Sequence, residues 1–274
     1  MVIQHNIAAI NSYRNLSTNQ SALSKNLEKL SSGYKINRAG DDAAGLAISE
    51  TMRSQINGLN QAVNNANDAI GLIQTAEGAL TETHSMLQRM KTLTTQAANS
   101  TYTDAARKNI QSEITALNDE ITRIATTTEF SGKKPLSPAK KGDTLTFFIG
   151  ASDDKNNGMT VTQTFMTATA LKLDSITVVS SAEAVKAMKT VEEAISTVST
   201  YRATLGAAQN RLEHTVNNLK VTSENITSAE SRIRDTDMAE EITAYTKNNI
   251  LLQAAQSMLS QSNAMPQGVL SMLQ

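Results

Sequence analysis

Residues 188–233 read MKTVEEAISTVSTYRATLGAAQNRLEHTVNNLKVTSENITSAESRI, and this stretch carries the strictest repeat of the chain. Its members recur at alternating steps of three and four residues: Met188, Val191, Ile195, Val198, Arg202, Leu205, Gln209, Leu212, Val216, Leu219, Ser223, Ile226, Glu230 and Ile233. This heptad pattern is typical of a long helix that packs lengthwise against other helices. Polar members such as Arg202, Gln209 and Glu230 lower stability but can fix the register. We therefore predict one helix from Ser181 to Ile233.

The segment before this helix has the pattern of a small β-hairpin. Thr, Val and Phe alternate in part over residues 144–149 and 159–165. Between these two runs, Asn157 and Gly158 favour a tight reversal. Glycine and proline punctuate residues 130–143 and separate the hairpin from the helical pattern before it.

Helical spacing also occupies the N-terminal half. Residues 43–98 contain no proline and predict one long helix, which Asp41 or Asp42 can cap. Its predicted seam consists of Ile56, Leu59, Val63, Ala66, Ile70, Ile73, Leu80 and Leu87, with Glu77 and His84 at intervening positions. Asp104 can cap a further helix to about residue 128.

A shorter amphipathic helix is predicted at each end of the chain. The N-terminal stripe consists of Ile3, Ile7, Ile10, Tyr13, Leu16, Leu23, Leu27, Leu30 and Tyr34, and Gly33 can take a left-handed C-cap. Residues 235–237 offer a break and a cap for the last helix. That helix includes Met238, Ile242, Tyr245, Leu252, Met258 and Leu259, and we expect Pro266 to interrupt it.

The order of these elements is nearly palindromic about the hairpin. We therefore predict a mainly α fold: an elongated antiparallel helical bundle or coiled coil, with a small β-hairpin at the chain midpoint and the N- and C-terminal helices paired. Three helices in the middle can share a core, but two at the ends bury too little surface to offset the entropy of ordering them. We expect the terminal segments to be disordered in a free subunit and to fold against copies of themselves.

Composition excludes several classes of function. The 274 residues carry 25 Lys and Arg against 26 Asp and Glu, no Cys and no Trp, so neither a thiolate metal site nor a strong field for nucleic acid is present. No apolar run approaches the roughly 18 residues that span a bilayer, and the first residues lack the pattern of a cleaved secretory signal. The chain contains no HExxH, GxSxG or P-loop motif. We predict no catalytic residue, metal or cofactor.

The longest motifs resemble one family. Residues 30–80 read LSSGYKINRAGDDAAGLAISETMRSQINGLNQAVNNANDAIGLIQTAEGAL and resemble the N-terminal conserved region of bacterial flagellins. LGAAQNRLEHTVNNL at 205–219, ENITSAESRIRDTDMAEE at 224–241 and the closing AMPQGVLSMLQ are similar to the C-terminal region of the same family. The resemblance covers about residues 1–132 and 181–274.

The resemblance implies a structural subunit that polymerises into the flagellar filament, the propeller for swimming. It implies an inner core of residues 1–42 and 235–274, an outer core of 43–130 and 181–234, and a short hairpin region at 131–180. The implied partners are other copies of the chain, a flagellar secretion chaperone at the C-terminal helix, and the filament cap and hook-associated proteins. The resemblance also implies extracellular placement after flagellar type III export without a cleaved signal peptide.

Two sets of residues are expected to carry interactions. Packing between subunits is expected at Ile3, Ile7, Ile10, Leu23, Leu27, Leu30, Ile242, Leu252, Leu259, Leu270 and Leu273. Arg89, Leu93 and Glu113 match the face by which the family binds a vertebrate Toll-like receptor. Residues 91, 92, 94 and 95 depart from the family's motif, so we expect weaker signalling than from typical agonists.

Two alternatives stay open at this point. A hook-filament junction protein would share the terminal helices but would form only a short collar. A helical signalling or adaptor protein of chemoreceptor type would also show long heptads, although it would normally carry a membrane span or a tip that binds an adaptor. No constellation of residues supports an enzyme.

Overall fold

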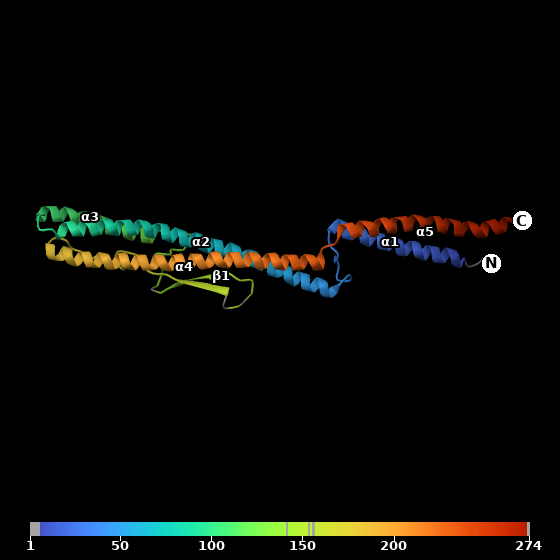
Figure 1. Cartoon of the computed structure of the whole chain (residues 1–274), viewed down its shortest axis with the longest axis horizontal. Coiled ribbons are helices and arrows are strands. Elements are labelled where there is room, and N and C mark those ends of the chain that lie inside the picture. The colour runs from blue at the N-terminus through green and yellow to red at the C-terminus, as the bar shows by residue number, and fades with distance from the viewer. Residues whose placement is uncertain (1–5, 141, 153, 155–156, 273–274) are drawn as a thin grey trace. The chain divides into compact units, whose positions relative to one another are not determined.

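The computed structural model describes residues 6–140, 142–152, 154 and 157–272, with the side chains of 266, 267 and 269–272 left out. Within these ranges the elements are α1 (Ile7–Ser32), α2 (Ala43–Ala98), α3 (Asp104–Thr127), β1 (Thr144–Phe148), β2 (Gly158–Thr162), α4 (Ser181–Arg234) and α5 (Met238–Met272) (Figure 1). The prediction of a mainly α fold with a hairpin near the midpoint is confirmed.

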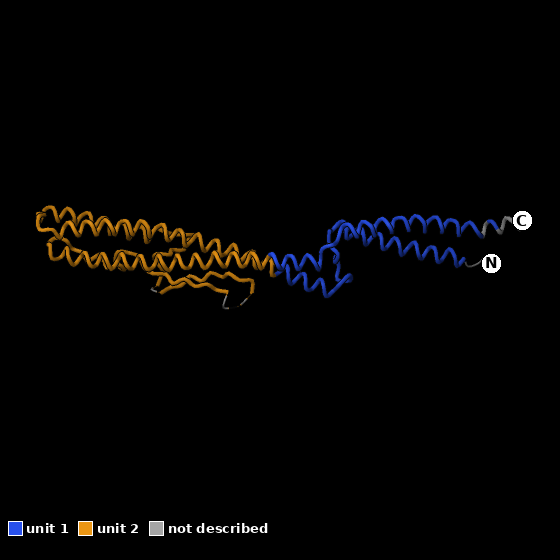
Figure 2. Tube along the Cα trace, viewed as in Figure 1, with its two compact units in different colours: residues 1–54, 224–274 blue, residues 55–223 orange. Residues whose placement is uncertain are grey.

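The chain divides into two compact units (Figure 2). Unit 1 comprises residues 1–54 and 224–274, and unit 2 comprises residues 55–223. Unit 1 therefore contains the terminal helices together with the first turns of α2 and the last turns of α4. Unit 2 contains the rest of the long helices, α3 and the hairpin.

The core of unit 2 lies between its helices, where buried positions follow the heptad spacing. On α2 they are Leu59, Ala62, Ala66, Ala69, Ile73, Ala76, Leu80, Thr83, Leu87, Met90, Thr94 and Ala97, and Leu72 and Leu93 beside this row are buried as well. On α4 they are Ala184, Ala187, Val191, Ala194, Val198, Tyr201, Leu205, Ala208, Leu212, Val216 and Leu219. From α3, Ile110, Ile114, Ile121 and Ala125 join the core, and the hairpin region adds further buried side chains such as Leu136, Val161 and Leu173.

The heptad prediction is confirmed, but at four alternate positions of each predicted seam the buried residue is the one just before the predicted residue. Val63, Ile70, Glu77 and His84 on α2, and Met188, Ile195, Arg202 and Gln209 on α4, are only half-buried. The residue before each of these is the buried one, and it is alanine in six of the eight cases. Small side chains let helix axes approach, while the larger neighbour covers the side of the contact.

The hairpin pairs β1 and β2 antiparallel, with Thr144 opposite Thr162 and Phe148 opposite Gly158. The predicted reversal at Asn157 and Gly158 is wrong, because Gly158 is itself a strand residue. The ladder continues past the strand ends, where the Ile149 N–H donates to the Asn157 carbonyl over 2.8 Å. The chain therefore turns before Asn157.

Two of the predicted helix caps are confirmed. Gly33 ends α1 at φ 74°, and its N–H donates to the Lys29 carbonyl over 2.8 Å. Asp42 precedes α2, and its Oδ1 accepts from the Gly45 N–H at 2.9 Å. These bonds satisfy backbone groups that a helix end would otherwise leave unpaired.

Two other predictions about helix ends are wrong. Thr103, rather than Asp104, caps α3, since its Oγ1 accepts from the Ala106 N–H at 3.3 Å. Asp104 lies in the first helical turn and pairs instead with Arg107. At the C-terminal end, α5 continues through Pro266. Proline removes one backbone donor, and the helix keeps its backbone form on both sides.

Candidate functional site

The described part of the chain holds no group of three or more His, Cys, Asp or Glu that could bind a metal. None of its described helices is long and apolar enough to cross a membrane. A cavity of about 580 Å³ lies between β2 and α4, and Arg211 is the one charged residue among its described lining residues. The cavity's other polar lining residues are Ser196, Tyr201 and several threonines, and the described lining includes no histidine or carboxylate that could activate a hydroxyl. The exposed apolar surfaces of the terminal helices are a second candidate site.

The terminal helices α1 and α5 lie side by side in unit 1 and run antiparallel (Figure 1). Near one end of the pair, Nδ2 of Asn6 donates to the carbonyl of Ser262 over 2.8 Å. Near the other end, Nζ of Lys29 lies 3.8 Å from Oε2 of Glu241. The prediction that the terminal helices pair is confirmed.

The side chains that lose exposure in this pair form two rows on each helix, with members seven residues apart. On α1, Ala9, Leu16, Leu23 and Leu30 form an apolar row, and Ser12, Asn19 and Asn26 form a polar row. On α5, the two rows are Tyr245, Leu252 and Leu259, and Glu241, Asn248, Ala255 and Ser262. Among the described side chains of these helices, only those of Asn26 and Ser262 are buried, and these two residues are still 9% and 6% exposed. The pair thus has a thin, half-polar seam.

Asn26 is the most connected residue of the polar row. With its amide turned to satisfy its hydrogen bonds, its nitrogen donates to Oε1 of Glu241 at 3.3 Å and its oxygen accepts from Nδ2 of Asn248 at 3.2 Å. A polar residue at a seam position favours the one register in which its partners are present, at some cost in stability. The contact therefore supports the antiparallel register of α1 and α5.

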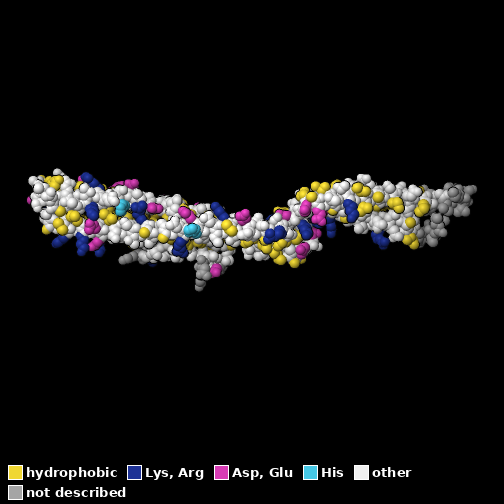
Figure 3. Space-filling view, viewed as in Figure 1, with side chains coloured by type: hydrophobic (Ala, Val, Ile, Leu, Met, Phe, Trp, Pro, Cys, Tyr) yellow, Lys and Arg dark blue, Asp and Glu magenta, His cyan; other side chains and the backbone are white. Residues whose placement is uncertain are grey.

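The outer faces of the same helices carry large apolar side chains that remain exposed, because no other described part of the chain covers them. On α1 they are Ile7, Ile10, Tyr13 and Leu27, and on α5 they are Met238, Ile242, Ile250, Leu251, Met258 and Met265. Figure 3 shows hydrophobic side chains at the surface along these helices. Ile10 is 60% exposed and Ile250 is 61% exposed. Large apolar side chains that remain exposed along one pair of helices are typical of a surface for protein association.

The structure places the predicted packing residues in two groups. Leu23, Leu30, Leu252 and Leu259 belong to the seam within the chain, whereas Ile7, Ile10, Leu27 and Ile242 lie on the outer faces. Ile3 and Leu273 lie outside the described residues, as does the side chain of Leu270. The apolar stripe predicted on each terminal helix combined residues of the seam with residues of the outer face. The stripe predicted on α5 omitted Ile250, Leu251 and Met265. Their apolar character and helical spacing were the signal that could have identified them.

The three predicted receptor-binding residues are not all on the surface. Nε of Arg89 donates to Oε1 of Glu113 over 2.8 Å, and this pairing raises the pKa of the guanidinium. Both side chains are exposed. Leu93, in contrast, is 2% exposed and packs in the core of unit 2. The Leu93 side chain packs against other core residues of unit 2, and the receptor-binding role of all three residues stays a prediction.

Long antiparallel helices and a terminal pair with exposed large apolar side chains are typical of structural proteins that assemble through helix surfaces. Family models for the bacterial flagellin N-terminal helical region and C-terminal helical region match residues 3–141 and 188–273. The chain belongs to the bacterial flagellin family.

Two relatives match this chain over the full length of both sequences. The chain is 50% identical over 303 residues to a flagellin of Bacillus subtilis (strain 168), covering all of both chains. It is 45% identical over 287 residues to the flagellar filament 33 kDa core protein of Treponema phagedenis, again with full coverage of both. The crystal structure of Bacillus cereus flagellin matches with a TM-score of 0.50 and 29% identity, covering 61% of this chain and 94% of that chain.

Proposed function

We propose that this chain is a structural subunit of the bacterial flagellar filament, and that copies of it polymerise through the outer faces of α1 and α5. The observation that carries the proposal is the set of large apolar side chains left exposed on those faces, including Ile10, Leu27 and Ile250. The full-length similarity to flagellins and to a filament core protein supports the same function. In a filament, residues 1–42 and 235–274 would form the inner layer and the long helices the outer layer.

The proposal is tested by adding a charge to the outer face. Leu27→Asp should abolish polymerisation, because an unpaired buried charge costs several kcal/mol and the contact recurs in every subunit. Circular dichroism should show that unit 2 remains folded. The matched control is Leu27→Met, which keeps an apolar side chain of similar volume and should polymerise normally. Long filaments from the Asp variant in electron micrographs would contradict the proposed surface.

A polymerisation assay also distinguishes a filament subunit from a hook-filament junction protein. A hook-filament junction protein would add only a short collar to an existing structure, whereas a filament subunit should extend seeds without limit. The full-length relatives named as flagellins favour the second outcome. Purified chain that lengthens filament seeds would decide for the filament subunit.

Other partners follow from the same surfaces. The exposed apolar side chains of α5 fit a secretion chaperone that covers this helix before assembly, and the filament cap and hook-associated proteins would contact the same terminal faces. We infer extracellular placement as part of the filament.

Arg89 and Glu113 provide an exposed polar pair for a Toll-like receptor. A reporter-cell titration that equals a strong agonist would refute the weaker signalling that we expect.

A further inference from the structure

The two connectors of unit 1 meet at Tyr34. One connector joins α1 to α2 and the other joins α4 to α5. Tyr34 and Asp235 form an antiparallel bridge between them. The Lys35 N–H donates to the Arg234 carbonyl over 2.6 Å, and the Thr236 N–H donates to the Gly33 carbonyl over 3.0 Å. The connectors are therefore joined by backbone hydrogen bonds on both sides of Tyr34.

The Tyr34 ring contacts two arginines that come from different helices. Cζ of Arg234, on α4, is 4.7 Å from the ring centroid, and Cζ of Arg53, on α2, is 6.0 Å from it. Nη2 of Arg53 also donates to the Tyr34 hydroxyl over 3.4 Å, and this bond is the main cause of a raised pKa for Arg53. A guanidinium over an aromatic face is attracted by the ring quadrupole.

Each arginine is also paired with a glutamate of the opposite long helix. Nε of Arg53 lies 3.4 Å from Oε1 of Glu230, and Nη1 of Arg234 lies 2.6 Å from Oε1 of Glu50. The Arg234 side chain is only 12% exposed, so solvent screens its contacts weakly. The two ion pairs link the N-terminal part of α2 to the C-terminal end of α4. Both arginines also contact the Tyr34 ring, which lies where the two connectors meet.

We propose that Tyr34, Arg53, Glu50, Glu230 and Arg234 form a joint that fixes the direction in which the α1–α5 pair leaves the ends of α2 and α4, and that this joint determines the shape of the filament rather than its assembly. The proposal rests on the proposed function. None of the five residues belongs to the exposed apolar faces that we assign to assembly. A small change of angle at the joint would be repeated in every subunit and would add up to a changed curvature or twist.

The side chains of the joint can be changed stepwise. Tyr34→Phe keeps the aromatic face under Arg234 and loses only the hydroxyl that accepts from Arg53, so filaments should keep nearly the wild-type shape. Tyr34→Leu removes both contacts and should give filaments of normal length with altered helical pitch or curvature. Arg234→Lys keeps the charge but loses the planar stacking group and should give an intermediate shape. Tyr102→Leu in unit 2 is the matched control and should leave the shape unchanged.

Electron microscopy of filaments measures the shape, and amide exchange in the same filaments measures the joint. The Lys35 and Thr236 amides, which donate across the connectors, should exchange about tenfold faster in Tyr34→Leu than in the wild type. Wild-type chains that form no filament would refute the proposed function itself. Wild-type filaments with a Tyr34→Leu variant of identical shape and exchange would overturn the joint alone. Loss of polymerisation in Tyr34→Leu would also overturn it, since it would place Tyr34 in assembly.

Discussion

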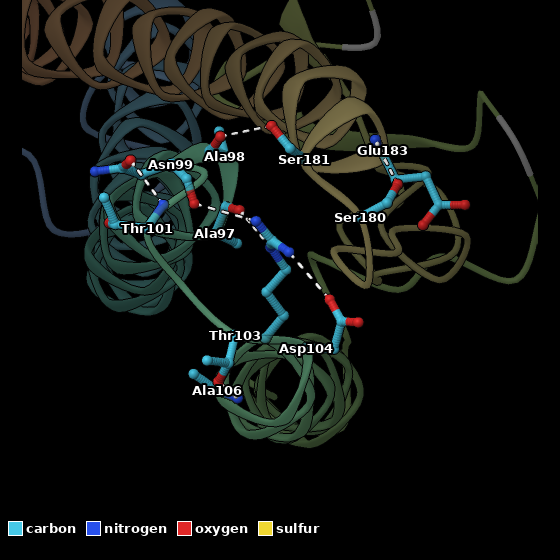
Figure 4. Close-up of polar contacts among 11 residues, drawn as sticks. Ala97, Ala98, Asn99, Thr101, Thr103, Asp104, Ala106, Ser180, Ser181 and Glu183 are labelled. Carbon is cyan, nitrogen blue, oxygen red and sulfur yellow. Dashed lines mark hydrogen bonds and ion pairs between the residues drawn. The ribbon is translucent and has the colours of Figure 1, made fainter.

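Arg107 closes the end of α2 from the first turns of α3. Its Nε donates to the Ala97 carbonyl over 3.0 Å and its Nη2 donates to the Asn99 carbonyl over 3.2 Å, while Nη1 pairs with Asp104 at 3.2 Å (Figure 4). The residue is 8% exposed. A cation at a helix C-terminus is also favoured by the aligned peptide dipoles. Ser181, at the start of α4, donates its hydroxyl to the neighbouring Ala98 carbonyl over 2.6 Å.

Removing this guanidinium should destabilise unit 2 strongly. We expect Arg107→Ala to lower the free energy of unfolding by about 3 kcal/mol, because the buried Ala97 carbonyl and the partly buried bond to the Asn99 carbonyl lose a charged donor. Urea unfolding followed by circular dichroism measures the change. Arg123→Ala is the control, since its pair with Glu120 is exposed on one helix face and should contribute less than about 0.5 kcal/mol. Equal midpoints for the two variants would contradict this role of Arg107.

Tyr201 predicts a dependence of stability on alkaline pH. Burial raises the pKa of its hydroxyl above the ordinary value of about 10. The neutral phenol is thus favoured in the folded chain, so its contribution is complete below about pH 10 and is lost as the pH rises through the raised value, by up to about 1.4 kcal/mol per unit. Tyr201→Phe should remove this slope in urea titrations. Tyr13→Phe, at an exposed position, should leave it in place.

At the scale of elements, glycine has opposite roles at two positions of α2. A Cβ on Gly58 would lie 3.0 Å from Cβ of Ala151, in the loop of the hairpin, and 3.3 Å from its Cα, whereas a Cβ on Gly78 would meet nothing within 4 Å. Gly78→Ala should therefore raise the free energy of unfolding by about 1 kcal/mol through helix propensity. Gly58→Ala should gain less or lose stability, because the loop must move. Thermal melts of both variants test the difference, and an equal gain would show that the loop is not packed on α2.

Much of the element order could be predicted from the sequence because caps and heptads are local. Asp42, Gly33 and the 3–4 spacing of α4 each identify a boundary or a face without reference to the rest of the chain. The position of the seam could not be predicted in the same way. Choosing the larger residue favoured Ile195 over Ala194, but burial depends on how closely two helices approach, and close approach favours the smaller side chain. For the same reason, sequence spacing assigned residues of the inner face and of the outer face of α1 to one stripe.

The joint at Tyr34 was missed for a related reason. A tyrosine at the end of an apolar stripe was interpreted as part of that stripe, while Arg53 and Arg234 are separated from it by many residues in sequence. Only the folded chain brings both guanidinium groups to one ring. Contacts of this kind depend on tertiary arrangement, and no local spacing indicates them.

At the scale of the molecule, the two units differ in how much they bury. Unit 2 has a continuous apolar core drawn from α2, α3, α4 and the hairpin region, whereas among the described side chains of α1 and α5 only Asn26 and Ser262 are buried. Hydrophobic burial must exceed the cost of ordering each residue, about 1–2 kcal/mol for the backbone alone. We expect the half-polar seam between α1 and α5 to fall short of this cost on its own, and we propose that the exposed outer faces supply the remaining stability when other copies cover them.

We therefore expect the terminal helices to be ordered in the filament and unfolded in a dilute subunit. Amides of residues 7–32 and 238–265 should exchange near the rate of an unstructured chain in the monomer, while those in the core of α4 should be protected. Polymerisation should protect both sets. Asn26→Leu provides an independent check: an apolar residue at the polar seam should strengthen pairing and slow exchange of the terminal amides in the monomer, while Asn249→Leu on the half-buried side of α5 should change it less. Full protection of the terminal helices in dilute wild-type monomer would show that the α1–α5 seam is sufficient by itself.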